Sequence, residues 1–568
     1  MISQLFRRKT DFSINSNHQL PRILSVRDLT FFGIAAIIGG GIFSSVGKAC
    51  AAGGPGVIWL FIISAIACGF AALSYAEFAG RIPVSGSAYT YAYASFGELF
   101  AWIIGWALLM EYAIGNIYIA FSWSGYFTHL LDAVGLELPR WLITDYSSVK
   151  SFIIEKNVDL LTSIQNVEYD KLWASSNLKG EELDFYLAWV NAPIFLGQKV
   201  IFDLPAVLIN ILITILVYRG ISESRKASNA MVILKVVIIL LVILVGAFYI
   251  DLDNFKPFNP NGMSGIMTGV SAVFFTYIGF DAVSTLAEES KNPKRDLPRG
   301  MFYSLLICTV LYILISLVLT GMVPFNLLGV DDPLAFALNF KGIHWLEYIV
   351  SVSAIIAMTS VLLVFQMGQP RIWMSMSRDG LLPNKFSKIH PKYKTPGFAT
   401  IITGLVVGLP IFFTNETFVL DFTSIGTIFA FVLVCGGVLL LPPRSADQHD
   451  GFKLKYINAK WWFPLLILTS AVLTQIYIPE YFKELKTNSF YAISHLIMWF
   501  IFIILSVFAF SRKWSLIPLL GVATCMFLLT GMTLDNWKWF GIWFLLGLIL
   551  YFSYGFNHSK LKNIPQKS

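Results

Sequence analysis

Long apolar segments separated by short polar ones run along almost the whole chain. Fourteen of them carry few charges and have roughly 20 residues, the length that an α-helix needs to cross a lipid bilayer. They lie at 30–52, 57–80, 98–122, 202–219, 228–250, 264–288, 301–323, 346–369, 397–414, 419–442, 461–478, 491–511, 515–532 and 537–555. The pattern predicts an all-α polytopic membrane protein with 14 spans. One longer connection, at 123–200, becomes too charged to cross.

The composition supports this fold class and argues against several functions. The 568 residues are 56% hydrophobic and 13% charged, with a mean hydropathy of +0.68, whereas about a quarter of the residues of a soluble domain are charged. The five cysteines lie in apolar segments and show neither a disulfide framework nor metal-ligand spacing. Phosphate-binding loops, catalytic-triad patterns and basic nucleic-acid-binding patches are missing from the sequence. We expect no enzyme activity, catalytic residue, cofactor, metal or nucleic acid partner.

The distribution of Lys and Arg predicts the orientation in the membrane. With a cytoplasmic N-terminus, the cytoplasmic segments hold 28 of the 41 Lys and Arg residues and the external ones 12, six of them in the long connection. Short cytoplasmic loops are enriched in positive charge, and the N-terminal residues show no cleavable signal peptide. Both termini are therefore predicted to be cytoplasmic, in a cell membrane (bacterial inner membrane or plasma membrane). The remaining lysine, Lys235, lies inside a span.

Two spans carry a helix-breaking stretch near their middle. The first span reads IIGGGIF at 37–43, and the sixth reads TYIGFDA at 276–282. The first span runs outward and the sixth inward, so spans 1–5 and 6–10 can form two halves of opposite orientation. Interrupted segments at corresponding positions of two inverted halves indicate the binding site of a transporter.

An unwound segment inside a membrane exposes backbone groups that must line a cavity or be buried in protein. A restarted half-helix offers its N–H groups and positive dipole end to an anion such as a carboxylate. The carbonyls that end the preceding half-helices, near Ile37–Ile38 and Phe274–Tyr277, suit an ammonium group. Donors for a carboxylate beside acceptors for an amine fit an α-amino acid. The alternative is that the glycines only allow close helix packing.

Three segments also carry a resemblance to a known family: LTFFGIAAIIGGGIFSSVGKAC, FDAVSTLAEESKNPKRDLPRG and GQPRIWMSMSRDGLLPNKFSKIHPKYKTP. The chain resembles the amino acid–polyamine–organocation superfamily over roughly residues 25–445, most closely the cationic amino acid transporter branch and its bacterial amino acid permease relatives. The resemblance implies a five-plus-five inverted-repeat core with discontinuous helices 1 and 6, alternating access, and four additional helices.

The resemblance also assigns the substrate's carboxylate and amine to the two breaks. It carries over as substrate-binding residues the following positions: Ile38, Gly39, Gly40, Gly41, Phe274, Tyr277 and Ile278. One departure is visible, because related sequences commonly have Ser, Thr or Ala where Gly40 stands. That difference removes a possible side-chain hydroxyl and leaves the backbone donors unchanged.

We expect four regions along the chain. They are a cytoplasmic N-terminal tail at 1–27, a first repeat at 28–250 that contains the connection at 123–200, a second repeat at 251–443, and peripheral spans with a cytoplasmic C-terminal tail at 444–568. The role of the long connection and of the last four spans is open.

Lys235 is the candidate for proton coupling. It stands about seven residues into the fifth span, roughly 10 Å from the membrane surface at a rise of 1.5 Å per residue. Charges at such depth are costly and often belong to proton relays or ion sites. Some members of the family place a lysine where sodium-coupled relatives bind sodium, which supports an ammonium near the first break. The alternative is a lysine that extends to the interface.

Four further residues in or near spans are candidates. Glu111 can pair with a cationic side chain of the substrate or with protein donors, and Asp281 either caps the restarted helix or handles substrate or protons. Met358, in the eighth span, can set the size of the side-chain pocket or can simply pack. Glu77, near the cytoplasmic end of its span, is expected to make a structural or gating contact.

Together these observations predict a secondary transporter that imports L-amino acids, coupled to protons as a symporter. Its partners are the amino acid, protons and membrane lipid. An amino acid exchanger is the alternative within transport, and a sensor without net flux is another, which the lack of an effector domain disfavours. The sequence leaves open which amino acid is carried, whether it is cationic or neutral, and the oligomeric state.

Overall fold

The computed structural model describes residues 5–9, 22–82, 84, 86–133, 135–155, 181–262, 273–274, 276–330, 332–441, 451–477, 481–485 and 490–563. These residues are almost entirely helical, and their one β-ladder is a two-stranded antiparallel hairpin, β1 (Ile194–Phe195) and β2 (Gln198–Lys199). Most of the first half of the predicted sixth span, at 264–272, lies outside the described residues.

The principal helices follow one another in the order in which the apolar segments occur. They are α2 (Val26–Ile37), α3 (Val46–Gly53), α4 (Val57–Arg81), α5 (Ala88–Ser95), α6 (Glu98–Ala133), α7 (Tyr146–Glu155), α10 (Glu181–Asn191), α11 (Leu204–Arg219), α12 (Ile221–Ala247), α15 (Pro293–Met322), α16 (Pro333–Phe340), α17 (His344–Arg378), α18 (Gly397–Gly408), α19 (Glu416–Leu440), α20 (Trp462–Tyr477), α21 (Tyr481–Glu484), α22 (Phe490–Arg512), α23 (Leu516–Thr530), α24 (Leu534–Leu550) and α25 (Phe556–His558).

Short π or 3₁₀ turns interrupt or join these helices. They are η2 (Gly41–Ser45), η3 (Gly54–Gly56), η4 (Arg140–Leu142), η5 (Leu252–Phe255), η6 (Phe280–Glu289), η7 (Phe325–Leu327), η8 (Asn384–Ser387), η9 (Pro410–Phe412), η11 (Tyr551–Gly555) and η12 (Lys560–Asn563).

Within the described residues, eight helical stretches are long and apolar enough to cross a membrane. They are Gly41–Arg81, Glu98–Asp132, Asn229–Ala247, Pro293–Met322, His344–Arg378, Phe422–Leu440, Phe490–Arg512 and Leu534–His558. Four apolar helices are shorter: Leu204–Arg219, Gly397–Phe412, Trp462–Tyr477 and Leu516–Thr530. Every predicted span except the sixth overlaps one of these stretches. The polytopic all-α class is therefore confirmed, while the 14-span inverted-repeat layout stays a prediction.

The first helix begins at a capping box that the sequence encodes. The backbone N–H of Asp28 donates to Ser25 Oγ at 3.4 Å, and the backbone N–H of Ser25 donates to Asp28 Oδ2 at 3.0 Å. This reciprocal arrangement satisfies two amides that a helix start leaves free. Asn229 of α12 also donates to Asp28 Oδ1 at 2.9 Å. The start of α2 is thereby fixed against the helix that carries Lys235.

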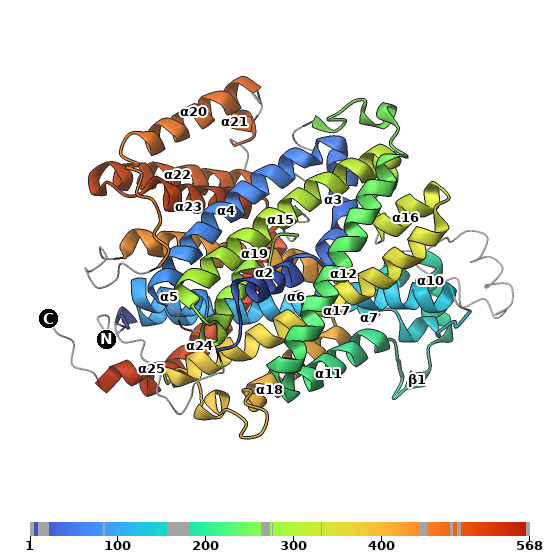
Figure 1. Cartoon of the computed structure of the whole chain (residues 1–568), viewed down its shortest axis with the longest axis horizontal. Helices are drawn as coiled ribbons and strands as arrows, with labels where there is room; N and C mark the ends of the chain where they lie inside the picture. Colours follow the sequence, from blue (N-terminus) through green and yellow to red (C-terminus); the bar gives the residue numbers. More distant parts are fainter. Residues whose placement is uncertain are drawn as a thin grey trace.

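The bundle has a buried core and a looser margin. Figure 1 shows α4 and α15 running side by side, with α2 next to α15, while α20 and α22 lie at the edge of the molecule. Helices α20, α22 and α23 share a separate small apolar cluster. Helix α24 instead packs on α6, where Trp102 and Trp106 donate to the carbonyls of Gly547 and Trp543, both at 2.8 Å. Helix α24 therefore packs against the core of the bundle.

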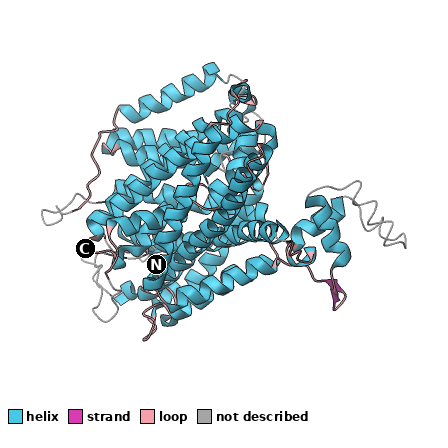
Figure 2. Ribbon diagram, turned by 45° about the vertical axis from the view of Figure 1, so that its right-hand side comes forward, coloured by secondary structure: helices cyan, strands magenta, loops and turns pink. Residues whose placement is uncertain are grey.

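A small lobe connects α6 to α11. Its described part, residues 135–155 and 181–203, contains α7, α10 and the hairpin and has an apolar cluster of its own. Figure 2 shows this lobe projecting from one end of the bundle. Arg140 joins the lobe to the end of α6 through an ion pair with Asp132 at 3.1 Å, and a second ion pair, with Asp184 of α10 at 3.0 Å, lies within the lobe. Neither α7 nor α10 is among the helices long and apolar enough to cross a membrane, as predicted for this connection. Residues 156–180 lie outside the described residues.

Candidate functional site at the two helix breaks

The first break lies where the three consecutive glycines predict it. Helix α2 ends at Ile37, and Ile38 is extended with φ −83° and ψ 100°. A π-helical turn, η2, restarts at Gly41 and leads directly into α3. The N–H groups of a helix start have no partner within the helix, so this junction presents backbone donors. It also leaves the last carbonyls of α2 available for side chains or ligands.

The second break consists of turns at residues 276–279 followed by η6. Gly279 has φ 114°, a conformation that other residues rarely adopt, and a Cβ here would lie 2.7 Å from the Cβ of Ala36. Glycine is thus required both by the backbone and by the approach of α2. The N-cap position of η6 is Gly279, and Asp281 is the second residue of the helix. The Asp281 carboxylate nevertheless interacts with the backbone N–H groups of Gly279 and Ala282 at this helix start.

The two breaks touch each other inside the protein. A Cβ on Gly41 would lie 2.8 Å from Thr276 Cα, which means that the backbones are in contact. The hydroxyl of Tyr312 in α15 lies 2.8 Å from Ile37 O and 2.9 Å from Thr276 O and can donate to either carbonyl. Close packing and helix interruption, which the sequence offered as alternatives, therefore occur together.

Lys235 is fully buried beside the first break. Its ammonium donates to the carbonyls of Ile38 at 2.6 Å and Ala35 at 3.1 Å, and to Ser360 Oγ at 2.9 Å. These three acceptors match the three protons of an ammonium group. Among the described residues no ion pair includes Lys235, so the charge is held by dipoles alone. The alternative of a lysine that extends to the interface is wrong, because the side chain points into the protein.

A buried acidic cluster lies next to the second break. The carboxylates of Glu111 and Asp281 interact electrostatically with each other and with the hydroxyl of Tyr75. Tyr112 approaches Asp281 Oδ2 at 3.5 Å. Within the described residues, Glu111 Oε2, Asp281 Oδ1 and the hydroxyl of Tyr75 have no hydrogen-bond partner. Because buried polar atoms are almost always paired, this cluster can receive donors from a bound ligand.

Apolar side chains surround the glycines of the first break. A Cβ on Gly40 would lie 2.8 Å from Ile119 Cδ1, and one on Gly39 would lie 2.3 Å from Val361 Cγ2. Met358 is buried and precedes Val361 by three residues on α17, which places both on one face of that helix. The side chain of Ile119 explains why position 40 is a glycine, because the Cβ of any larger residue at position 40 would clash with Ile119.

The remaining predicted residues are also buried. Phe274, Tyr277 and Ile278 are at most 3% exposed. The hydroxyl of Tyr277 donates to Phe61 O in α4 at 3.1 Å, so its contribution at the break comes from its backbone. Glu77 makes structural contacts instead, accepting from Arg81 Nε at 2.8 Å and from the backbone of Leu454 at 2.7 Å.

Two charged pairs join α17 to the end of η6, on the predicted cytoplasmic side. Arg371 of α17 pairs with Glu289 at 2.7 Å, and Arg378 pairs with Glu288 at 2.9 Å. The backbone N–H of Leu24 donates to Glu289 O at 2.9 Å, which ties the chain before α2 to the end of η6. These contacts are named the ion-pair cluster below.

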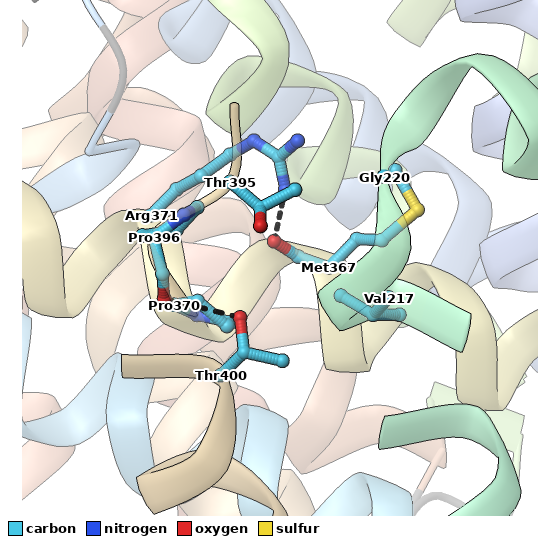
Figure 3. A pocket seen from close by; sticks show the side chains of 8 residues that line it. All are labelled: Val217, Gly220, Met367, Pro370, Arg371, Thr395, Pro396 and Thr400. Carbon is cyan, nitrogen blue, oxygen red and sulfur yellow. Dashed lines mark hydrogen bonds between the residues drawn. The ribbon is translucent and has the colours of Figure 1, made fainter. Parts of the chain in front are cut away.

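A narrow crevice lies beside the ion-pair cluster (Figure 3). Its lining comes from Val217 of α11, Met367, Pro370 and Arg371 of α17, and Thr400 of α18, together with the segment before α18. The guanidinium of Arg371 turns back to the carbonyl of Met367, next to the proline that interrupts the helix ladder. The crevice belongs to the end of the bundle and is separate from the breaks.

Several residues of the site carry no signal that sequence analysis could have used. Tyr312 and Val361 look like ordinary core residues, and Ser360 is one of many hydroxyls in the spans. Arg371 and Glu289 stand in the two charged segments that carry the family resemblance. The sequence does not show that these two residues form an ion pair, since 82 residues separate them.

Comparisons with known proteins identify the family of the chain. The sequence model described as "Amino acid permease" matches residues 24–500, and a model for the C-terminus of the same permeases matches residues 516–559. The branched-chain amino acid permease BcaP of Bacillus subtilis (strain 168) is 35% identical over 566 residues, which are 99% of this chain and 100% of the relative.

Two further relatives cover the larger part of the chain. The methylthioribose transporter of Bacillus subtilis (strain 168) is 39% identical over 460 residues, covering 80% of this chain and 89% of the relative. The chloroplastic cationic amino acid transporter 9 of Arabidopsis thaliana is 35% identical over 447 residues, covering 78% and 70%. All three relatives are named as permeases or transporters, and none as an enzyme.

Proposed function

The chain belongs to the amino acid permease family, and we propose that it imports a neutral, aliphatic L-amino acid together with a proton. Membership confirms the resemblance to the amino acid–polyamine–organocation superfamily. It also confirms that the protein is a multi-pass membrane transporter and not an enzyme. The direction of transport, the proton and the substrate class are the proposed parts.

The observation that carries the proposal is the environment of Lys235. The ammonium donates to Ile38 O and Ala35 O at the end of α2. A change in the charge of Lys235 would therefore change the contacts of the helix end that forms the first break. Since no carboxylate among the described residues pairs with Lys235, the proton can leave without breaking an ion pair. Release of the proton would weaken the link between α2, α12 and α17, which is the coupling that a symporter needs.

The substrate's α-carboxylate and α-amine would bind backbone groups at the two breaks. The proposed site comprises Ile38, Gly39, Gly40, Gly41, Phe274, Tyr277 and Ile278, with Glu111, Asp281 and Met358 around the side-chain pocket. Ile119 and Val361 give this pocket an apolar wall, which favours an aliphatic side chain. The full-length match to a branched-chain amino acid permease supports the same choice, and this match includes the last four helices.

Alternating access would require the ion-pair cluster to open. Arg371–Glu289 and Arg378–Glu288 join α17 to η6 on the predicted cytoplasmic side, and in this proposal the substrate leaves after these pairs separate. We propose the orientation with both termini in the cytoplasm, because the cluster then lies at the exit side of an importer.

A competition assay tests the substrate class. Purified protein in liposomes takes up labelled L-leucine while unlabelled L-isoleucine, L-valine, L-arginine, D-leucine or methylthioribose is added. We expect L-isoleucine and L-valine to compete and D-leucine to fail. Once the two breaks fix the amine and the carboxylate, only the side chain of the L-enantiomer would point into the apolar pocket. Competition by L-arginine alone would instead assign the carboxylates of Glu111 and Asp281 to a cationic side chain.

Methylthioribose is the second candidate substrate. The relative that carries this name is 39% identical, and an apolar wall suits a methylthio group. Methylthioribose has neither an ammonium nor a carboxylate, so it leaves the paired donors and acceptors of the breaks unexplained. Uptake of methylthioribose in the absence of leucine uptake would favour this candidate.

A further inference from the structure

The tip of the hairpin in the lobe is apolar and exposed. Ile194, Phe195 and Leu196 are 70%, 68% and 89% exposed, and they follow one another at the end of β1. Their hairpin is well formed, with Ile194 opposite Lys199 and Phe195 opposite Gln198. The exposure is therefore a property of an ordered element.

The turn itself does not explain the apolar residues. Leu196 and Gly197 have φ 50° and 76°, which is the pattern of a two-residue hairpin turn that normally carries Asn, Asp or Gly. A leucine with positive φ is uncommon and contributes nothing to this turn. A bare leucine, phenylalanine and isoleucine at one tip indicate a surface that meets an apolar partner.

The position of the hairpin selects the partner. Only Val200–Asp203 separate β2 from α11, so the base of the hairpin lies at most about 17 Å from the first residue of that helix, at 3.3 Å per residue. Asp203 is the N-cap of α11, and its carboxylate accepts from the backbone N–H of Ala206 at 2.9 Å. Leu208 and Leu212 on α11 are 48% and 61% exposed, as expected of a lipid-facing helix.

Figure 1 shows the hairpin near the start of α11, and Figure 2 shows its strands at the lower edge of the projecting lobe. Its base carries groups typical of a membrane interface, where aromatic and basic side chains gather. Lys199 donates to the carbonyl of Trp189 and lies 4.5 Å from the centre of its ring. The apolar tip thus belongs to an element that directly precedes a lipid-facing helix and has an aromatic and a basic side chain at its base.

We propose that the hairpin tip inserts into the lipid leaflet beside α11 and anchors the lobe to the membrane surface. The ligand is the acyl and glycerol region of membrane lipid, taken up by Ile194, Phe195 and Leu196. The lobe is then held at two points, by the ion pair between Arg140 and Asp132 on one side and by lipid on the other.

Site-directed spin labelling tests this proposal in the full-length protein. The five native cysteines are all buried, so Leu196→Cys can be labelled selectively in protein reconstituted into liposomes of phosphatidylcholine and phosphatidylglycerol. Ser151→Cys, on an exposed position of α7, is the water-exposed control. Leu212→Cys on α11 is the lipid-exposed control. Accessibility to oxygen reports lipid, and accessibility to a water-soluble nickel chelate reports water.

The label at Leu196 is expected to resemble the label at Leu212, with frequent collisions with oxygen and few with nickel. Frequent collisions with nickel, as at Ser151, would overturn the proposal because the tip would then lie in water. Rare collisions with both reagents would also overturn it, because protein, either this chain or a second copy, would then cover the tip. Uptake of labelled leucine by each labelled variant verifies that the protein is folded.

Discussion

Replacement of Lys235 by alanine is the sharpest perturbation of the proposed coupling. It removes the ammonium from Ile38 O, Ala35 O and Ser360 Oγ. Hydrogen bonds to a charged group contribute about 1.5–3 kcal/mol each, so the two backbone contacts account for about 3–6 kcal/mol. Burial of one ion costs several kcal/mol in the opposite sense. Because these contributions largely cancel, we expect the variant to fold with a stability within about 2 kcal/mol of the original.

The effect on transport is expected to be much larger. An imposed gradient of one pH unit supplies about 1.4 kcal/mol per proton, which drives accumulation of about tenfold at one proton per substrate. In Lys235→Ala this accumulation should fall to about the level of simple equilibration, since the proton has lost its binding group. Exchange of labelled for preloaded substrate should persist, because the backbone groups of the breaks remain.

Liposomes with purified protein allow both quantities to be measured in one preparation. Ser360→Ala is the matched control, because it removes one acceptor and retains the lysine. The contacts of Lys235 with the carbonyls of Ala35 and Ile38 are unaffected by this substitution. The hydroxyl of Ser360 itself donates to Ala357 O within the same helix, at 2.7 Å. Gradient-driven accumulation that is unchanged in Lys235→Ala would refute the coupling role.

Three further substitutions test the site and its closure. Gly41→Ala should abolish uptake, because the new Cβ would lie 2.8 Å from a backbone atom of the second break. The control variant Gly69→Ala should transport normally, because its new Cβ meets nothing within 4 Å. Equal uptake by both variants would argue against contact between the breaks. Met358→Ser should widen the range of amino acids that compete with leucine uptake, and an unaltered competition panel would leave this methionine a packing role. Arg371→Met should lower the free energy of unfolding by about 3–5 kcal/mol, because it leaves the buried carboxylate of Glu289 without its partner. The double variant with Glu289→Met should recover most of this loss, as measured by thermal unfolding of detergent-solubilised protein. A double variant less stable than the single one would contradict the pairing.

The first break was predictable because it is encoded locally. Three consecutive glycines cannot continue a helix without cost, and the chain has no comparable run within another span. The second break was predictable in position from Gly279. The 3₁₀ form of η6 was not, because DAVSTLAEE has no local feature that excludes an α-helix, and its geometry depends on packing against α2.

The partners of Lys235 show where sequence analysis stops. The depth of the lysine in its span indicated a charge inside the membrane, and the family resemblance placed it near the first break. Its acceptors come from segments 197 to 200 residues earlier and 125 residues later in the chain, and no spacing rule connects them. Tyr312 illustrates the same limit, since its hydroxyl joins both breaks although its surroundings resemble any other apolar span.

The most direct test of the central claim is the uptake of labelled L-leucine by the unmodified protein in sealed liposomes. Uptake is measured with an imposed inward proton gradient and again after the gradient has been collapsed with an ionophore. The account predicts accumulation above the external concentration only while the gradient is present. Accumulation that does not depend on the gradient, or uptake only into liposomes preloaded with amino acid, would contradict proton symport, and the latter result would make the protein an exchanger.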